Sequence, residues 1–413
     1  MPNLYFTVKT LPTVGFGDQL GTQFSRLYAL GSLLGLEYCY SPIIFPRSVE
    51  PAWLKTIKKF IFYIRYHIVF SNINNPLFKI IGNIIEMIEL YLEGANSIIK
   101  NEKLSKYIGL KRKKTRRASY CDIYIDKLIE KGPFTLRHLE EYLNLESRKK
   151  GRENTIIRFC WTRNTYNHIP QIDSLCGTAS VNHETQAHTF LARQYWEARK
   201  YRENRKTERR LKTSSNALVI HIRCGDSAVI DLGSRKFTIN GTRIVTDEEL
   251  KSILSIDGNR IPIELGSYNN ILKSLFSHFD SDAFQVFIIS DGYERSYHNF
   301  LRCLLKPNNS IELTDNEKKC FRKLIKTMNS EFKQFDYFNN THFFIGEIKK
   351  NLFASIDALV DAKIMIWGSG GFAYYTHTLF KNSPSLLIHV KNFTDETINS
   401  IKQFMIEKSV DNA

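Results

Sequence analysis

Short apolar runs in the second half of the chain alternate with longer segments in which apolar residues recur every three or four positions. Short runs bounded by polar residues are typical of strands buried on both faces, and here they cover 217–222, 284–290, 364–367 and 386–389. The periodic segments predict helices over 268–279, 294–305, 348–362 and 372–380, and a last helix that begins at Thr394. Strands that alternate with helices in this way predict an α/β fold with a parallel sheet.

The start of the chain repeats this order. Residues 4–8 predict one strand and residues 37–40 a second one. Between them, a stretch with Gly15 and Gly17 precedes apolar positions spaced i, i+4 and i+7 over residues 20–34, which predict a helix with one buried face. A strand, a glycine loop, a helix and a strand form the opening unit of a doubly wound sheet.

The stretch from 48 to 210 has a helical and irregular pattern. Residues 55–93 are rich in Ile, Phe and Tyr with scattered Lys, and they predict two amphipathic helices separated near 72–76. Two interpretations of these helices are open. A second hydrophobic core is favoured over a position in a membrane interface.

The length and composition of the chain limit the classes of protein to which it can belong. A chain of 413 residues is long enough for two domains, which we assign to 1–212 and 213–413. No apolar run reaches the length of about 18 residues without charges that a transmembrane helix needs, and the first residues resemble a strand more than a signal peptide. The seven cysteines are scattered and form no C-x-x-C pair, which disfavours a zinc site or a disulfide framework and favours the cytoplasm.

The net charge of +16 calls for an anionic partner. Basic residues gather in three runs, at 111–117, 148–152 and 199–212. Nucleic acid, anionic lipid headgroups and a polyanionic substrate would all be attracted to such runs, and a solvated surface is the alternative. No aromatic side chains for base stacking interrupt the first two runs. We therefore disfavour nucleic acid and expect the basic runs to dock the chain either on the inner face of an anionic membrane or on an anionic glycan.

The strand at 217–222 carries the strongest candidate chemistry. It delivers His221, Arg223 and Asp226 to its carboxyl end, where open α/β sheets bind their ligands. An arginine there suits a phosphate, and a carboxylate a few residues later can orient the guanidinium. A strand that simply runs into a turn, with Arg223 solvated, is the alternative interpretation.

Two more strand ends are expected at the same edge of the sheet. One ends in Ser290 and Asp291, and the other in a small-residue loop that opens a helix. Backbone N–H groups at a helix N-terminus form a second anion site. The residues of this loop and of the first helical turn are Ser369, Gly370, Gly371 and Phe372.

Taken together, these motifs resemble the GDP-fucose-dependent fucosyltransferase superfamily, which includes α1,2-, α1,6-, nodulation and protein O-fucosyltransferases. Residues 221–226 are similar to its H-x-R-x-x-D motif, and residues 15–19 to its G-x-G-[NC]-Q loop. Residues 287–291 correspond to a strand that ends in Ser/Thr-Asp. The resemblance covers residues 4–40 and 215–390, and Cys224 stands where several members have a second arginine.

The resemblance implies a GT-B-like fold, in which two Rossmann-like domains face each other across a cleft. It implies donor binding by a set of residues that includes Asp357, near the family's guanine-reading Asp: His221, Arg223, Asp226, Gly15, Gly17, Gln19, Ser290, Asp291, Asp357, Ser369, Gly370, Gly371 and Phe372. Asp18 in the glycine loop is either the catalytic base or the cap of the following helix.

The implied reaction is inverting transfer of fucose from GDP-fucose to a glycan hydroxyl, without cofactor or metal. Arg223 and the amides at 369–371 would stabilise the departing diphosphate, and Asp18 would accept the proton of the incoming hydroxyl. Asp280 and Asp282 spell the D-x-D of metal-dependent sugar transferases but precede their strand, so we interpret them as part of a turn. A sulfotransferase-like or other nucleotide-dependent transferase, and a basic nucleic-acid-binding protein, are the alternatives.

Overall fold

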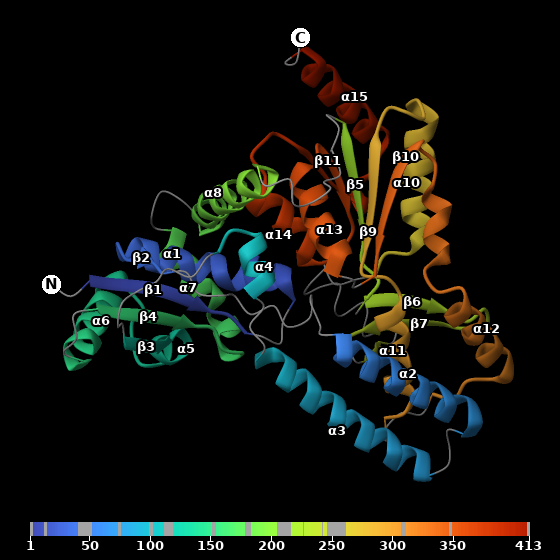
Figure 1. The fold of residues 1–413 in the computed structure, drawn as a ribbon, viewed down its shortest axis with the longest axis horizontal. Helices are drawn as coiled ribbons and strands as arrows, with labels where there is room; N and C mark the ends of the chain where they lie inside the picture. Colours follow the sequence, from blue (N-terminus) through green and yellow to red (C-terminus); the bar gives the residue numbers. More distant parts are fainter. Residues whose placement is uncertain are drawn as a thin grey trace. The chain divides into compact units, whose positions relative to one another are not determined.

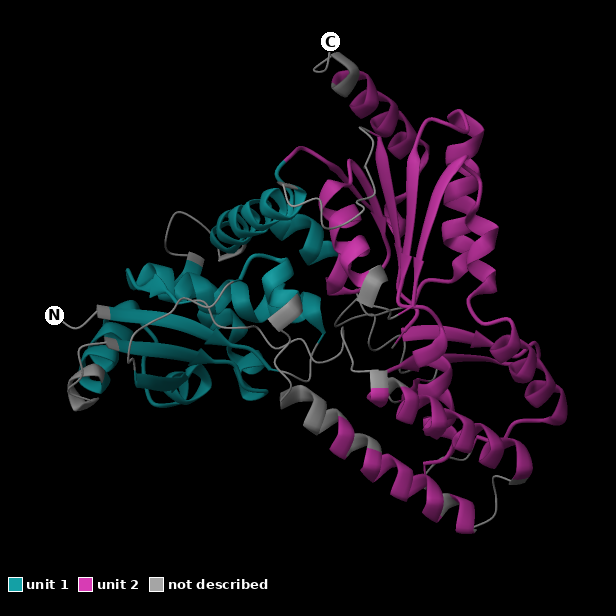
Figure 2. Ribbon diagram, viewed as in Figure 1, with its two compact units in different colours: residues 1–49, 95–210, 374–382 teal, residues 50–94, 211–373, 383–413 magenta. Residues whose placement is uncertain are grey.

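The computed structural model describes residues 3–11, 15–39, 52–72, 76–98, 102–110, 119–150, 154–177, 183–204, 216–225, 227–241, 243–245, 262–306, 311–346 and 349–410. The chain forms two compact units (Figure 2). Unit 1 comprises residues 1–49, 95–210 and 374–382, and unit 2 comprises residues 50–94, 211–373 and 383–413. Both units are discontinuous in sequence, and the predicted domains 1–212 and 213–413 stay a prediction.

Unit 1 contains a four-stranded parallel sheet with the strand order β2-β1-β4-β3 (Figure 1). The two predicted strands are confirmed as β1 (Asn3–Lys9) and β2 (Glu37–Tyr38). The other two, β3 (Ser119–Tyr124) and β4 (Asn154–Cys160), lie in the stretch predicted to be helical and irregular. Asp122 and Arg158 face each other across these strands as an ion pair, and such polar positions hide a strand from a search for apolar runs.

The helices of unit 1 pack their apolar side chains against this sheet. Phe6 of β1 contacts Tyr28 and Tyr38, and Phe24 stacks on Phe190, so aromatic rings fill much of the core. The helices are α1 (Ser25–Leu33), α4 (Glu102–Tyr107), α5 (Ile125–Glu130), α6 (Leu136–Lys150), α7 (Ile169–Gly177) and α8 (His183–Asn204), with the π-helix η1 (Asp18–Phe24) and the 3₁₀-helix η2 (Asn164–His168).

Unit 2 contains a five-stranded parallel sheet with the order β10-β9-β5-β11-β12. Four strands were predicted and are confirmed: β5 (Ala217–Ile222), β9 (Gln285–Ser290), β11 (Ile364–Trp367) and β12 (Leu386–His389). The fifth, β10 (Asn340–Ile345), was missed because it is a half-buried edge strand that begins with polar residues. The predicted α/β class with parallel sheets is confirmed.

Helices cover both faces of this sheet (Figure 1). Leu218 and Ile220 of β5 share a core cluster with α10 (Leu265–His278), whereas Val219 shares the opposite cluster with α13 (Lys349–Asp361). Burial on both faces explains why β5 is apolar at nearly every position. The other helices include α11 (Glu294–Leu304), α12 (Asp315–Lys326), α14 (Gly371–Phe380), which ends in unit 1, and α15 (Asp395–Val410), with 3₁₀-helices at Ser330–Phe335 and Val390–Asn392.

The two predicted amphipathic helices are confirmed as α2 (Ala52–Asn72) and α3 (Pro76–Ile98). Their inner faces extend the core of unit 2 and do not form a second core of their own. Ile61, Val69 and Ile85 belong to the same buried cluster as β5. Among the helices that the structure describes, none has the length and apolar character to cross a bilayer.

A small antiparallel sheet follows β5, where the sequence predicted only a polar excursion. It comprises β6 (Ser227–Asp231), β7 (Lys236–Asn240) and β8 (Arg243–Val245).

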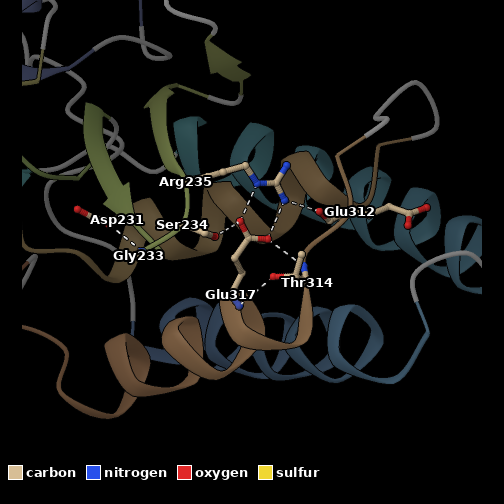
Figure 3. A network of polar contacts seen from close by, with 7 residues as sticks. All are labelled: Asp231, Gly233, Ser234, Arg235, Glu312, Thr314 and Glu317. Carbon is tan, nitrogen blue, oxygen red and sulfur yellow. Dashed lines mark hydrogen bonds and ion pairs between the residues drawn. The ribbon is translucent and has the colours of Figure 1, made fainter.

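Glu317 ties the β6–β7 turn to α12 (Figure 3). Its buried carboxylate accepts hydrogen bonds from Arg235 Nε at 2.6 Å and Nη2 at 2.7 Å, and from Ser234 Oγ at 2.7 Å. The backbone N–H of Thr314 donates to it at 2.9 Å as part of the capping box of α12. The bonds from Arg235 lower the pKa of Glu317 to about 2.

Substituting Glu317→Gln should lower the free energy of unfolding by about 2 kcal/mol at neutral pH, because the charge-assisted bonds are lost. Denaturant unfolding measures this, with Glu312→Gln as the control because Glu312 is exposed. The folded-state pKa lies below the usual 4.5, so the wild type keeps this stability above pH 4.5 and loses it as the pH falls toward 2. Equal unfolding midpoints for wild type and Glu317→Gln would contradict this role.

Candidate functional site

The carboxyl ends of β5, β9 and β11 lie side by side in the sheet of unit 2. Ile222 is paired with Ser290 of β9, and His221 is paired with Trp367 of β11. Because the three strands end level with one another, the residues that follow them gather at one edge. The structure therefore brings together most of the predicted strand-end residues: Arg223, Ser290, Asp291, Ser369, Gly370 and Gly371.

Asp291 holds the turn that follows β5. Its Oδ1 accepts a hydrogen bond from the backbone N–H of Cys224 at 2.9 Å. A Cβ atom on Gly225 would lie only 2.0 Å from Asp291 Oδ2, so this contact requires glycine. From the other side, Ser296 Oγ donates to the carbonyl oxygen of Gly225 at 3.0 Å. These contacts position the segment that begins with Arg223.

Arg223 lies against the glycine loop that opens α14. Gly370 has φ +91°, and a Cβ atom there would lie 2.9 Å from Arg223 Cδ. Both its left-handed backbone and this close approach require glycine at position 370. The guanidinium therefore lies close to the N-terminus of α14, which begins at Gly371. A cationic side chain beside a helix N-terminus provides the two components of an anion site.

His221 is buried beside Arg223. Its ring centroid lies 6.1 Å from that of Phe372 in the first turn of α14. Burial, reinforced by the charge of Arg223, lowers the pKa of His221 to about 3, so the imidazole is neutral at neutral pH. Within the described part of the chain, its Nδ1 has no hydrogen-bond partner. His221 can therefore offer a neutral hydrogen bond to a ligand, but not a positive charge.

A cavity of about 190 Å³ opens beside Arg223. Its lining combines Lys236, Asp231 and Glu264 with two tyrosines at the start of α11, Tyr293 and Tyr297. Lys236 Nζ lies 3.2 Å from a Glu264 oxygen and 3.4 Å from an Asp231 oxygen. Glu331 also lines the cavity, and burial raises the pKa of its carboxyl. The cavity is therefore suited to a small polar group.

In unit 1, Asp18 belongs to a separate polar cluster at the start of η1. Its Oδ2 accepts hydrogen bonds from the hydroxyl of Tyr166 and, at 3.2 Å, from Gln23 Nε2. Gln23 Oε1 in turn accepts from the backbone N–H of Leu11 at 2.7 Å. Gln19, which is buried, accepts from Thr10 Oγ1 at 2.9 Å. A π-helix is rare and often marks a functional site.

The glycine loop predicted at residues 15–19 is instead the first turn of a helix. Phe16 and Gly17 are already helical, and Gly17 has φ −63°, which any residue adopts. Gly21 is the glycine that packing requires, because a Cβ atom there would lie 2.0 Å from the ring of Tyr375. Gly15 is exposed, with no atom within 4 Å of an added Cβ.

The remaining predicted residues include several outside the described part of the chain and one on α13. Asp226 and the basic run at 111–117 lie outside the described residues. Asp357 lies on α13, four residues before the helix ends. Because α13 leads back to the start of β11, this position is toward the amino edge of the sheet. The other basic runs, at 148–152 and 199–212, lie partly outside the described residues.

The turn predicted at Asp280 and Asp282 is confirmed. Asn339 Nδ2 donates to Ser281 Oγ at 3.0 Å and to Asp282 Oδ1 at 2.9 Å, so these side chains close the connection between α10 and β9. Among the residues that the structure describes, no three His, Cys, Asp or Glu side chains gather as a metal site would need.

A scan against protein-family models found no match for this chain, and searches of curated proteins and of solved structures found none either. The resemblance to the fucosyltransferases therefore stays a hypothesis carried by residues and motifs. Two clusters of polar side chains are candidates for the functional site, one around Arg223 in unit 2 and one around Asp18 in unit 1.

Proposed function

We propose that the chain is a glycosyltransferase that transfers fucose from GDP-fucose to a glycan hydroxyl, with inversion and without metal. The observation that carries this proposal is the position of Arg223, which lies against Gly370 at the N-terminus of α14. In this proposal, unit 2 binds the donor, unit 1 binds the acceptor, and the two act as the Rossmann-like domains of a GT-B enzyme in the cytoplasm.

The Arg223 cluster has the chemistry that a nucleoside diphosphate donor needs. The guanidinium can fork onto phosphate oxygens, while the amides at 369–371 face the same anion. Neutral His221 adds a hydrogen bond without adding charge. As the anomeric carbon–oxygen bond breaks, its electron pair leaves on the diphosphate, and these groups stabilise the developing charge. The cavity beside Arg223 would hold a polar part of the donor.

Asp18 is the proposed base. The acceptor hydroxyl oxygen attacks the anomeric carbon from the face opposite the diphosphate, and the hydroxyl proton passes to the Asp18 carboxylate. Tyr166 donates a hydrogen bond to that carboxylate and would fix its orientation. The hydrogen bond from Tyr166 favours the role of base over that of helix cap, because a capping carboxylate would accept its hydrogen bonds from backbone N–H groups.

Thermal-shift measurements with GDP test the donor site. GDP at about 100 times its dissociation constant should stabilise the wild type by about 2.7 kcal/mol. In Arg223→Ala the affinity for GDP should fall about 10- to 100-fold, because a charge-assisted contact is lost. Arg243→Ala removes an exposed arginine of the same unit and should bind GDP normally. Equal GDP affinity in Arg223→Ala and Arg243→Ala would refute the site, and preference for a sulfated adenine nucleotide would favour a sulfotransferase.

Asp18→Asn tests the base. This variant keeps the size of the side chain but cannot take up the proton, so its single-turnover rate should fall by roughly 10²- to 10⁴-fold with donor affinity unchanged. Tyr166→Phe should lose less, because the carboxylate remains. An Asp18→Asn chain with wild-type turnover would exclude Asp18 as the base. Weaker donor binding with a proportionate loss of rate would assign Asp18 to the donor site.

A further inference from the structure

The outward face of α3 is a continuous stripe of exposed apolar side chains. Six of its large apolar residues are between 47% and 78% exposed. Their spacing of mostly three or four residues places them along one side of the helix. They are Leu77, Ile80, Ile84, Met87, Ile88 and Tyr91.

The opposite face of α3 packs against the rest of unit 2, and these contacts fix the rotation of the helix so that the apolar stripe faces outward. Ile85 is buried in the core of unit 2. Glu86 accepts a hydrogen bond from Arg302 Nη2 of α11 at 2.9 Å. At Gly82, an added Cβ atom would lie 3.4 Å from Leu305 Cβ, so the helix approaches α11 closely there. The apolar stripe is therefore held on the surface by contacts on the other side of the helix.

The helix α2 adds an aromatic part to this surface. Trp53, Phe60 and Tyr63 are between 49% and 65% exposed. Among the residues described, nine of the fourteen exposed large apolar side chains lie on α2 and α3. Phe60 and Tyr63 also line a groove of about 420 Å³ that reaches Phe78 of α3. Such a concentration of exposed apolar side chains marks an interaction surface.

The charged residues of α2 are all basic. The sequence of α2 contains no Asp or Glu, and Lys59 is exposed next to Phe60. The sequence of α3 contains three glutamates and one lysine, and of these glutamates Glu86 is paired with Arg302. The whole chain carries a net charge of +16. Aromatic and aliphatic side chains flanked by lysine are suited to the boundary between acyl chains and anionic headgroups.

We propose that α2 and α3 dock this chain on the surface of a bilayer that contains anionic lipids. The apolar side chains enter the headgroup boundary, and the helices do not cross the membrane. A second copy of the chain fits less well, because pairing two α2 faces would bring Lys59 residues together with no exposed acidic side chain opposite them among those described. The proposal is independent of the transferase reaction.

The first test is sedimentation of the full chain with vesicles, one set of phosphatidylcholine and one in which phosphatidylserine replaces part of it. The chain should bind the anionic set, and high salt should weaken binding. The double variant Leu77→Gln/Met87→Gln should bind roughly 100-fold more weakly. The substitutions remove the free energy gained when two apolar side chains pass from water into the bilayer. The control, Leu145→Gln/Ile406→Gln, changes equally exposed apolar residues of α6 and α15 and should bind like the wild type.

A second readout does not depend on that variant. Brominated lipids in the anionic vesicles should quench tryptophan fluorescence of the wild type, and Trp53→Phe should lose this quenching. Failure of the wild type to bind either vesicle set would overturn the proposal. So would equal binding by Leu77→Gln/Met87→Gln and its control. Self-association that the double variant abolishes, without vesicle binding, would assign the surface to a second copy.

Discussion

The hydrogen bond from the backbone N–H of Cys224 to Asp291 joins the ends of two neighbouring strands, and the arrangement of the candidate site depends on it. Parallel pairing of β5 with β9 and β11 places three strand ends at one edge. The Asp291 carboxylate then determines where the chain goes after β5, and Gly225 allows it to approach. Arg223 stands directly before this bond, so its guanidinium is presented at the glycine loop of α14.

Strands that stand out as apolar runs were predictable, whereas several others were not, including the inner strand β4 and the edge strand β10. The strands β5, β9, β11 and β12 are apolar runs because the sheet of unit 2 is covered on both faces, so their sequences carry a strong signal. β4 contains Arg158, which forms an ion pair with Asp122 of the neighbouring β3. Such pairing is a property of the assembled sheet and leaves little trace in a local pattern.

The same distinction applies to the candidate site. Arg223, Asp291 and Gly370 could be predicted to meet, because parallel strands that alternate with helices end at one edge. The contact between Asp18 and Tyr166 could not be predicted, because 148 residues separate them and a lone tyrosine in a short 3₁₀-helix carries no sequence signal. The neutral state of His221 could not be predicted from the sequence either, because it follows from burial of the side chain in the folded protein.

The helices α2 and α3 show how one sequence pattern can serve two surfaces. Their richness in Ile, Phe and Tyr favoured a hydrophobic core, and Ile61, Val69 and Ile85 do enter the core of unit 2. Apolar residues on the opposite face remain exposed. A helix with two apolar faces buries only one of them within its own unit. A sequence pattern that predicts a core therefore does not exclude an interaction surface.

Hydrogen–deuterium exchange with and without GDP tests the central claim most directly, namely that the carboxyl edge of the five-stranded sheet binds a nucleoside diphosphate. A bound diphosphate would order the backbone amides of the glycine loop and of the turn after β5. We predict slower exchange in peptides that contain residues 223–225 and 368–372, with peptides from α12 and α15 unchanged. Unchanged exchange at both segments under saturating GDP, or protection confined to other parts of the chain, would contradict the account.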